Sequence, residues 1–396
     1  MATVAFHTLG CKVNSYESEA MLEIFKKRGY DNIDFDSPAD VYVINTCTVT
    51  NTGDSKSRQM IRKAHRTNPD AVICVVGCYS QVASEEITEI EGVSVVLGTQ
   101  HRASIVDFVE EYKMTHKQIV KIENVMKVSR FEDLSIHAFE NKTRAFLKIQ
   151  DGCNNFCTYC IIPYARGGVR SRPKEDVLSQ AQELVDRGFV EIVLTGIHTA
   201  GYGVDLDNYS FYDLLVDLTT KIKGLKRLRI SSIEMSQVSD EIIELIGRSP
   251  IIVDHLHIPI QSGTDSILRR MARHYNTAEF EKKYFELKEA LPGISITTDV
   301  IVGFPGETEE DFVDTYNWIK KLHFNQLHVF PYSRRKGTPA DRMPNQVPGD
   351  VKKDRVRRLL QLSDELKTEF ALSEMNKELE VLIEEEKDGY MVGHAS

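Results

Sequence analysis

The sequence predicts an α/β protein: an N-terminal doubly wound parallel sheet, a central (βα)6 partial barrel and a short C-terminal β segment. Two observations predict this class. Short apolar runs alternate with helical patterns through the first third of the chain, and six further candidate strands alternate with helical stretches after it. A chain of 396 residues is long enough for two or three domains of roughly 150 residues each.

The first predicted domain covers residues 1–120. Its candidate strands are Thr3–Thr8, Val41–Asn45, Ala71–Val76 and Val93–Leu97. Asn14 followed by Glu17 is typical of a helix start. A capping side chain and a glutamate three positions later can each accept a hydrogen bond from a free backbone N–H of the first turn. Short apolar strands separated by helices indicate a parallel sheet covered on both faces.

A strand-poor connector is predicted over residues 121–141 and a second α/β domain over residues 142–375. The candidate strands of this domain are Ala145–Gln150, Val190–Gly196, Leu228–Ile233, His255–Ile260, Ser295–Val302 and Gln326–Phe330. Because a closed barrel of this type has eight strands, six strands with intervening helices predict a partial barrel.

The end of the chain changes character. Prolines and glycines between residues 337 and 349 mark a break before a long amphipathic helix, which is predicted to begin near Val351. Residues 376–396 have the pattern of a strand, a turn at Asp388 and Gly389, and the start of a second strand. Since an isolated hairpin is only marginally stable, we expect these residues to begin a small β domain.

Composition excludes several classes of protein. Hydrophobic residues make up 41% and charged residues 27%, which excludes a disordered or collagen-like chain. No apolar run approaches the ~18 residues of a transmembrane helix. The N-terminus lacks the basic and apolar regions of a secretory signal. We therefore expect a cytoplasmic protein without a membrane partner.

The net charge of −10 is unevenly distributed. Residues 331–360 hold nine basic and three acidic side chains, whereas residues 361–396 hold three basic and ten acidic ones. A basic segment of this kind is typical of nucleic-acid binding, but solvated helix faces explain it equally well.

The seven cysteines indicate metal or redox chemistry, because an odd number in a large chain without a signal sequence argues against a disulfide framework. Cys153, Cys157 and Cys160 follow the first strand of the second domain with the spacing Cys-x3-Cys-x2-Cys. Three thiolates on one loop suit three irons of a 4Fe-4S cluster and leave the fourth iron open. Zinc or an inert structural cluster is the alternative, but a second Cys-x2-Cys unit for zinc is missing from the sequence.

Cys11, Cys47 and Cys78 form a second set, because each follows a predicted strand of the first domain. The carboxyl ends of parallel strands meet at one edge of a sheet, so we expect these three thiols to converge there and hold a second metal centre. Buried free thiols are the alternative. Cys74 lies within a strand, about 13 Å from Cys78, and is expected to belong to the core.

The first cysteine loop, with the aromatic Tyr159 before its last cysteine, resembles that of the radical S-adenosylmethionine superfamily. The resemblance implies that Cys153, Cys157 and Cys160 are catalytic and that the open iron binds S-adenosylmethionine. Its reductive cleavage would give a 5′-deoxyadenosyl radical. The predicted partial barrel, with this loop at the carboxyl end of its first strand, agrees with that implication.

Nearly the whole chain resembles the radical S-adenosylmethionine methylthiotransferases. The matching segments are Thr8–Asn14, Asn45–Cys47, Gly77–Cys78, Asp151–Cys153, Ile230–Glu234, His257–Gly263 and Thr298–Glu307. The family ends in a small RNA-binding β-barrel, the TRAM module, of which residues 376–396 resemble only the beginning. Leu9–Ser18 resembles the branch that acts on N6-threonylcarbamoyladenosine at position 37 of tRNA. Branches that act on isopentenyladenosine or on a ribosomal-protein aspartate are the alternatives.

The resemblance implies two 4Fe-4S clusters, two molecules of S-adenosylmethionine and the tRNA anticodon stem-loop as substrate. One cofactor molecule would methylate sulfur held by the cluster of Cys11, Cys47 and Cys78, and the other would supply the radical that attacks C2 of adenine. A low-potential donor of the flavodoxin or ferredoxin type and a monomeric state are also expected. Radical chemistry suits this position because C2 has no acidic proton for a side-chain base to remove.

Candidate S-adenosylmethionine contacts lie at strand ends of the second domain. They are Tyr159, Thr195, Gly196, Glu234, Gln261, Ile301 and Gly303. Tyr159 is expected near the adenine, Gly196 near the amino-acid end and Glu234 at the ribose. The alternative for each is an ordinary turn, since polar residues and glycines are common where strands end.

Candidate RNA contacts are basic side chains, because arginine and lysine suit phosphate. They are Lys56, Arg58, Arg166, Arg170, Arg172, Arg334 and Arg335. Ordinary salt bridges are the alternative, as is a role for Arg166 in the barrel. A non-catalytic iron–sulfur protein for electron transfer, or a pure RNA-binding module, is the remaining alternative for the whole chain.

Overall fold

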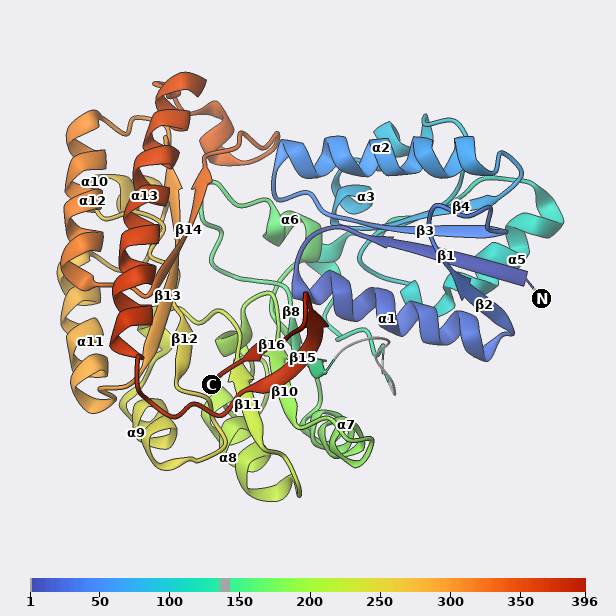
Figure 1. Cartoon of the computed structure of the whole chain (residues 1–396). Helices are drawn as coiled ribbons and strands as arrows, with labels where there is room; N and C mark the ends of the chain where they lie inside the picture. The colour runs from blue at the N-terminus through green and yellow to red at the C-terminus, as the bar shows by residue number, and fades with distance from the viewer. Residues whose placement is uncertain (1, 135, 137–142) are drawn as a thin grey trace.

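The computed structural model describes residues 2–134, 136 and 143–396, and it places two α/β lobes side by side (Figure 1). The first lobe is built on one parallel sheet with the strand order β2-β1-β3-β4-β5-β6. Its strands are β1 (Ala2–Thr8), β2 (Tyr30–Ile33), β3 (Val41–Thr46), β4 (Val72–Gly77), β5 (Val93–Leu97) and β6 (Ile119–Lys121). This order reverses direction between β1 and β3, which is the point where sheets of this class bind ligands.

Helices cover both faces of this sheet, with α2 on one face and α1 and α5 on the other (Figure 1). They are α1 (Lys12–Lys27), α2 (Asn51–Thr67), α3 (Cys78–Val82), α4 (Ser84–Thr88) and α5 (Ile105–Thr115), with a 3₁₀ turn η1 (Arg102–Ser104). The central strands β3, β4 and β5 are buried along their whole length, as parallel strands between two helical layers must be. The predicted doubly wound domain is therefore confirmed.

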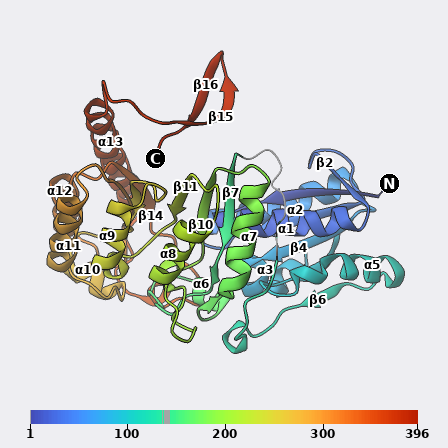
Figure 2. The same cartoon turned by 90° about the horizontal axis from the view of Figure 1, so that it is seen from below.

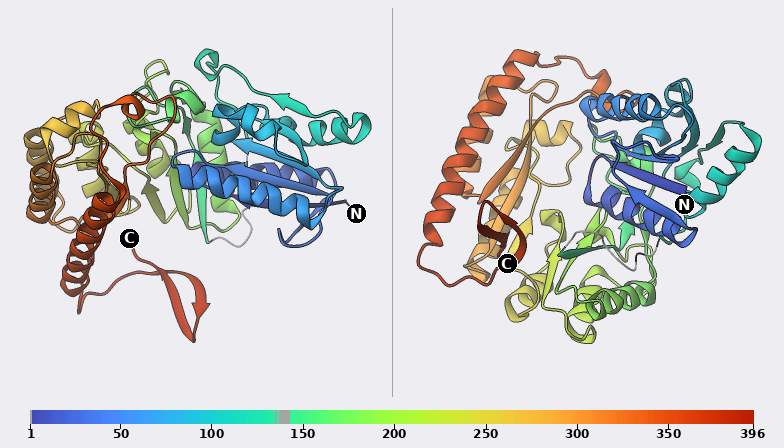
Figure 3. Two further views of the ribbon diagram at one scale, coloured as in Figure 1. Left: turned by 90° about the horizontal axis from the view of Figure 1, so that it is seen from above. Right: turned by 45° about the vertical axis from the view of Figure 1, so that its right-hand side comes forward.

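The second lobe is an open arrangement of six strands (Figure 3). Two parallel sheets of the order β11-β10-β7 and β12-β13-β14 are joined by a bridge between Ser232 and His257. The strands are β7 (Arg144–Lys148), β10 (Glu191–Thr195), β11 (Arg227–Ile230), β12 (His255–His257), β13 (Ser295–Val302) and β14 (Gln326–Pro331). The six predicted strands are all present, in the order that a partial barrel requires.

Helices surround these strands on the outside, except the short α6 (Ile162–Arg166), which lies between the two lobes against α3 (Figure 2). The surrounding helices are α7 (Lys174–Asp186), α8 (Phe211–Lys221), α9 (Asp240–Arg248), α10 (Asp265–Arg270), α11 (Thr277–Ala290), α12 (Glu309–Leu322) and α13 (Gly349–Ser373). Short 3₁₀ turns complete the lobe: η2 (Val125–Lys127), η3 (Thr199–Gly201), η4 (Met235–Gln237) and η5 (Pro339–Arg342). No helix among the described residues is both long and apolar enough to cross a membrane.

Several local expectations differ from the structure. Helix α1 begins at Lys12 rather than at Asn14, and Asn14 is buried with its amide donating to Leu9 O and Thr46 O instead of capping a helix. The edge strands β2 and β6 were not predicted, because they are short and half polar. The first barrel strand is split into β7 and a two-residue strand β8 (Gln150–Asp151), which pairs with β9 (Arg170–Ser171).

The end of the chain follows the prediction closely. Helix α13 packs against β14, and β15 (Leu382–Lys387) pairs with β16 (Tyr390–His394) across a turn in which both Asp388 and Gly389 have positive φ. This hairpin lies across one end of the second lobe, where Arg144 contacts Glu384 at 2.6 Å (Figure 2). The predicted connector crosses residues 135 and 137–142, which lie outside the described part of the chain.

Candidate active site

The first cysteine loop leaves β8 and runs into α6 at the mouth of the barrel. Cys157 is buried, and the Cys160 N–H donates to Cys157 O at 2.9 Å, which folds the loop back on itself. Burial raises the pKa of Cys153 to about 11 and that of Cys160 to about 12. Because such thiols ionise only beside a strong positive charge, this donor set fits a metal cluster better than a reactive free cysteine.

Two polar residues outside the cysteine motif, Arg273 and Glu234, contact this loop. Arg273 Nη1 lies 3.5 Å from Cys157 Sγ and 3.0 Å from Glu234 Oε1, and Asn155 Nδ2 donates to the same carboxylate oxygen at 2.9 Å. Glu234 was predicted to reach a cofactor ribose, and the structure places it beside the cysteine loop. Arg273 was missed because nothing in its local sequence links it to cysteines more than a hundred residues away.

The second cysteine set converges as predicted. Cys11, Cys47 and Cys78 follow β1, β3 and β4 at the carboxyl edge of the sheet, and the three thiols are close enough to influence one another's ionisation. Gly10 has φ +111°, and a Cβ there would lie 2.9 Å from Cys47 Cβ, so only glycine allows this approach. Burial raises the pKa of Cys78 to about 12, so this thiol stays protonated unless a metal ion or cluster binds it. Cys74 is fully buried within β4, as expected of a core residue.

Arg166 links the two lobes next to this second set. Its Nε donates to Cys78 Sγ at 3.2 Å, and its Nη atoms contact both Glu17 oxygens at 2.7 and 3.0 Å and Asp151 at 3.1 Å. Lys148 reaches the same two carboxylates at 2.7 and 2.6 Å. All four charged side chains are nearly inaccessible to solvent, so α1 of the first lobe is held to the barrel by a buried ionic network.

Two cavities lie between the cysteine sets. The smaller, of about 260 Å³, is lined by Tyr159, Gln261 and Ile301 beside Cys160. The larger, of about 620 Å³, is lined by Thr195 and Gly196, and also by Cys11 of the other lobe. Asp299 and Phe330 line both cavities, so the two spaces adjoin.

Five of the predicted S-adenosylmethionine contacts thus line these cavities, and Gly303 does not. Its N–H donates to Glu307 Oε1 at 2.8 Å, and a Cβ built on it would meet Lys352 Cγ at 2.1 Å. The backbone N–H of Gly303 is thus already used within the fold, and its contact with S-adenosylmethionine stays a prediction.

The larger cavity also contains the side chains of His257, Asp299 and His328. Their ligand atoms lie within 4.8 Å of one another, and His257 Nε2 is 3.2 Å from Asp299 Oδ1. Two histidines and a carboxylate can hold a divalent metal ion.

Four predicted RNA contacts are corrected by the structure. Arg166, Arg170, Arg172 and Arg335 are each no more than 6% exposed. Arg335 donates to Asp54 Oδ2 at 2.7 Å and to Asn51 Oδ1 at 2.6 Å, which ties the segment after β14 to α2. These four guanidinium groups are buried inside the protein, where they form internal ion pairs and hydrogen bonds. None of them can contact an RNA phosphate in this conformation.

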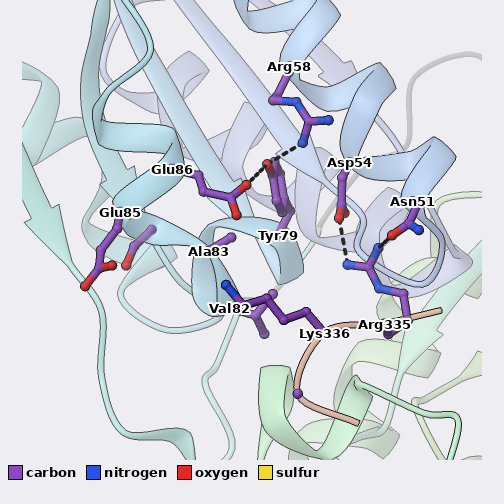
Figure 4. A pocket seen from close by; sticks show the side chains of 12 residues that line it. Asn51, Asp54, Arg58, Tyr79, Val82, Ala83, Glu85, Glu86, Arg335 and Lys336 are labelled. Atoms are coloured by element: carbon purple, nitrogen blue, oxygen red, sulfur yellow. Dashed lines mark hydrogen bonds and ion pairs between the residues drawn. The ribbon is translucent and has the colours of Figure 1, made fainter. Parts of the chain in front are cut away.

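The other three predicted RNA contacts remain accessible. Lys56 and Arg334 are exposed, and Arg58 is half-buried with its Nη1 donating to Tyr79 Oη at 2.6 Å. Figure 4 shows Arg58 and Lys336 at opposite sides of one cavity, with Arg335 held between Asn51 and Asp54. This cavity of about 650 Å³ also contains Glu85 and Glu86, so its charge is mixed.

Comparison with family models divides the chain into two parts. Residues 3–98 match the model described as Uncharacterized protein family UPF0004, and residues 147–319 match the Radical SAM superfamily. The second match spans the first cysteine loop and the strands of the barrel up to β13.

Similar proteins cover almost the whole chain. The threonylcarbamoyladenosine tRNA methylthiotransferase MtaB of Bacillus subtilis (strain 168) is 57% identical over 100% of this chain and 88% of its own. The protein of the same name from Aquifex aeolicus (strain VF5) is 40% identical over 97% of this chain and 93% of its own. The tRNA-2-methylthio-N(6)-dimethylallyladenosine synthase of Finegoldia magna is 36% identical over 97% of this chain and 84% of its own.

Solved structures share the fold at low sequence identity. The radical S-adenosylmethionine methyltransferase TsrM from Kitasatospora setae, with cobalamin and a [4Fe-4S] cluster bound, has a TM-score of 0.63 at 15% identity, over 86% of this chain and 77% of its own. The cobalamin-dependent radical enzyme OxsB, bound to aqua-cobalamin and S-adenosylmethionine, has a TM-score of 0.55 at 12% identity, over 98% of this chain and 63% of its own. The two-lobed arrangement thus occurs in other radical enzymes.

Proposed function

Because this chain belongs to the MtaB-type branch of the radical S-adenosylmethionine methylthiotransferases, we propose that it converts N6-threonylcarbamoyladenosine at position 37 of tRNA to its 2-methylthio derivative. The family uses S-adenosylmethionine and 4Fe-4S clusters. We assign one cluster to Cys153, Cys157 and Cys160 and the second to Cys11, Cys47 and Cys78.

One observation supports this proposal: one cysteine of each set lines one of two adjoining cavities. The cavity beside Cys160 adjoins the larger cavity that contains Cys11, through Asp299 and Phe330. A methylthiotransferase must bring a radical source and a sulfur source to one carbon atom. An adenine base held in the larger cavity would lie between the radical source beside Cys160 and the sulfur source beside Cys11.

When bound, the clusters supply the electron that cleaves S-adenosylmethionine to a 5′-deoxyadenosyl radical and the sulfur that is methylated and transferred. The residues of the chain position these groups and exclude water. Tyr159, Gln261 and Ile301 form a mostly apolar wall suited to an adenosyl group. Arg273 and Arg166 each direct an N–H toward a cysteine sulfur, and such hydrogen bonds tune a cluster's reduction potential.

The partners follow from the same reaction. We propose the tRNA anticodon stem-loop as substrate, with phosphate contacts at the exposed Lys56 and Arg334 and at the half-buried Arg58. A flavodoxin- or ferredoxin-type donor would deliver the electrons, and a cytoplasmic monomer suffices, because both cysteine sets belong to one chain.

The test is an anaerobic reaction. The protein is reconstituted with iron and sulfide, reduced, and incubated with S-adenosylmethionine and tRNA that carries threonylcarbamoyladenosine. The RNA is then digested for mass spectrometry. A 2-methylthio nucleoside that is absent with Cys157→Ala supports the proposal. Release of 5′-deoxyadenosine without a modified nucleoside contradicts the proposed substrate.

The same assay separates the alternatives. Conversion of dimethylallyladenosine in preference to threonylcarbamoyladenosine would place the chain with relatives such as the Finegoldia magna synthase. Modification of a ribosomal-protein aspartate would place it in a third branch. Two bound clusters without any cleavage of S-adenosylmethionine would indicate an electron-transfer protein.

A further inference from the structure

Lys12 is a cation without a partner at the entrance of the larger cavity. It is the first residue of α1 and follows Cys11 directly, and its exposed side chain lines the cavity between the two lobes. Within the described residues, its ammonium group makes no hydrogen bond or ion pair. The guanidinium groups of Arg144 and Arg229 add to the positive potential around it.

The other two charged side chains that line this cavity, Arg229 and Asp299, each contact an ionisable partner. Arg229 Nε contacts Glu191 Oε1 at 2.8 Å, and Asp299 Oδ1 contacts His257 Nε2 at 3.2 Å. Among the described residues, Lys12 is therefore the one charged side chain of the lining that makes no direct contact with an opposite charge or a polar partner, although the more distant Glu191 partly offsets its charge. An anionic group of a ligand would supply that contact, and the start of a 16-residue helix at the same place adds a favourable dipole.

The cavity also holds buried polar atoms without partners. Among the residues that the structure describes, Ser231 Oγ has no hydrogen-bond partner, although Ser231 is only 9% exposed. His255 Nδ1 also lacks a partner there, while its Nε2 contacts Thr297 Oγ1 at 3.1 Å. Both residues line the same cavity as Lys12. Since buried polar groups are nearly always paired in proteins, these atoms indicate a ligand with hydrogen-bonding groups.

We propose that Lys12 determines substrate specificity by binding the carboxylate of the threonylcarbamoyl group, with Ser231 and His255 available to its carbamoyl and hydroxyl groups. This inference rests on the proposed function, because it assigns one end of that substrate. A dimethylallyl group offers neither a charge nor a hydrogen-bonding atom, so it would leave all three side chains unpaired. Binding an uncharged analogue would therefore be penalised.

The experiment compares two synthetic anticodon stem-loops. One carries threonylcarbamoyladenosine, and the other carries the same nucleoside with its carboxylate converted to a primary amide. Dissociation constants and kcat and KM for 2-methylthio product are measured under anaerobic conditions with the whole chain. We expect the unaltered protein to bind the acid about 10- to 100-fold more tightly than the amide, as a charge-assisted hydrogen bond implies.

Lys12→Gln should raise the KM for the acid by that same factor and leave the KM for the amide unchanged, so that the discrimination disappears. Lys12→Arg should retain it. Lys27→Gln is the matched control, because Lys27 lies on the same helix, is 61% exposed and pairs with Glu23. This control should change neither constant.

Equal weakening of both stem-loops by Lys12→Gln, or no weakening of either, would overturn the inference. A higher KM for S-adenosylmethionine with unchanged stem-loop binding would assign Lys12 to the carboxylate of the cofactor, and would also overturn it. If the proposed function itself is wrong, the result differs from those that overturn the role of Lys12. In that case the unaltered protein makes no 2-methylthio product from the acid, while the binding comparison still reports on Lys12.

Discussion

Replacing Arg166 by methionine removes the centre of the ionic network that joins the two lobes. The side chain is fully buried and makes four kinds of contact: both oxygens of Glu17, the carboxylate of Asp151, Asn14 Oδ1 at 2.9 Å and Cys78 Sγ at 3.2 Å. Methionine fills a similar volume but donates no hydrogen bond. The two carboxylates would then share the remaining cations of the network.

The expected loss of stability follows from the ion pairs that Arg166 no longer makes. Removing one member of a buried ion pair costs about 3–5 kcal/mol, because the partner charge stays buried without full compensation. Lys148 still contacts both carboxylates and Arg102 still contacts Glu17, so the lower part of this range is expected. Arg166→Lys keeps the charge but not the planar fork, and should lose less.

Hydrogen exchange of backbone amides measures this loss of stability locally, in helix α1. We expect the amides of α1 to exchange about 100- to 1000-fold faster in Arg166→Met, since each 1.4 kcal/mol is about a factor of ten in an opening equilibrium. Arg357→Met is the control, because Arg357 is 69% exposed and its pair with Asp354 is worth no more than about 1 kcal/mol. Exchange in Arg166→Met within a few fold of the unaltered protein would refute the view that this network holds the lobes together.

Three further predictions concern single side chains. Burial alone would raise the pKa of Glu17, but nearby cations, Arg102 foremost, hold it below its usual 4.5. The carboxylate therefore stabilises the fold fully above that pH and progressively less below it. The urea midpoint should thus lose little of this contribution between neutral pH and pH ~5, and should fall as the pH drops below ~4.5, less steeply in Glu17→Gln. Lys56→Gln should weaken tRNA binding and lower the slope of affinity against salt by about one, whereas an unchanged slope would exclude a phosphate contact there. Cys74→Ala should leave the iron content intact and cost about 1 kcal/mol in chemical unfolding, and loss of iron would contradict its place in the core.

Much of the fold could be predicted because its signals are local. The apolar runs of β3, β4 and β5 are continuous, and each cysteine of the second set comes directly after a strand that the sequence marks clearly. Parallel topology then brings distant residues together without further information. The short edge strands β2 and β6 escaped prediction because Tyr30–Ile33 and Ile119–Lys121 have too few apolar residues to form a pattern.

The errors at the site share one physical cause. A buried arginine and an RNA-binding arginine have the same sequence signal, and only the position of the acidic partner distinguishes them. For Arg166 that partner is Glu17, which is 149 residues away and belongs to the other lobe. Glu17 was itself interpreted as part of a helix start.

The central claim is that the two cysteine sets have separate tasks in one reaction. The most direct measurement is the yield of 5′-deoxyadenosine and of 2-methylthio nucleoside in parallel reactions of Cys47→Ala and Cys157→Ala, each with its iron content determined. Cys157→Ala should give neither product. Cys47→Ala should still cleave S-adenosylmethionine but transfer no methylthio group. Loss of cleavage in Cys47→Ala with the first cluster intact, or methylthio transfer by that variant, would contradict the account.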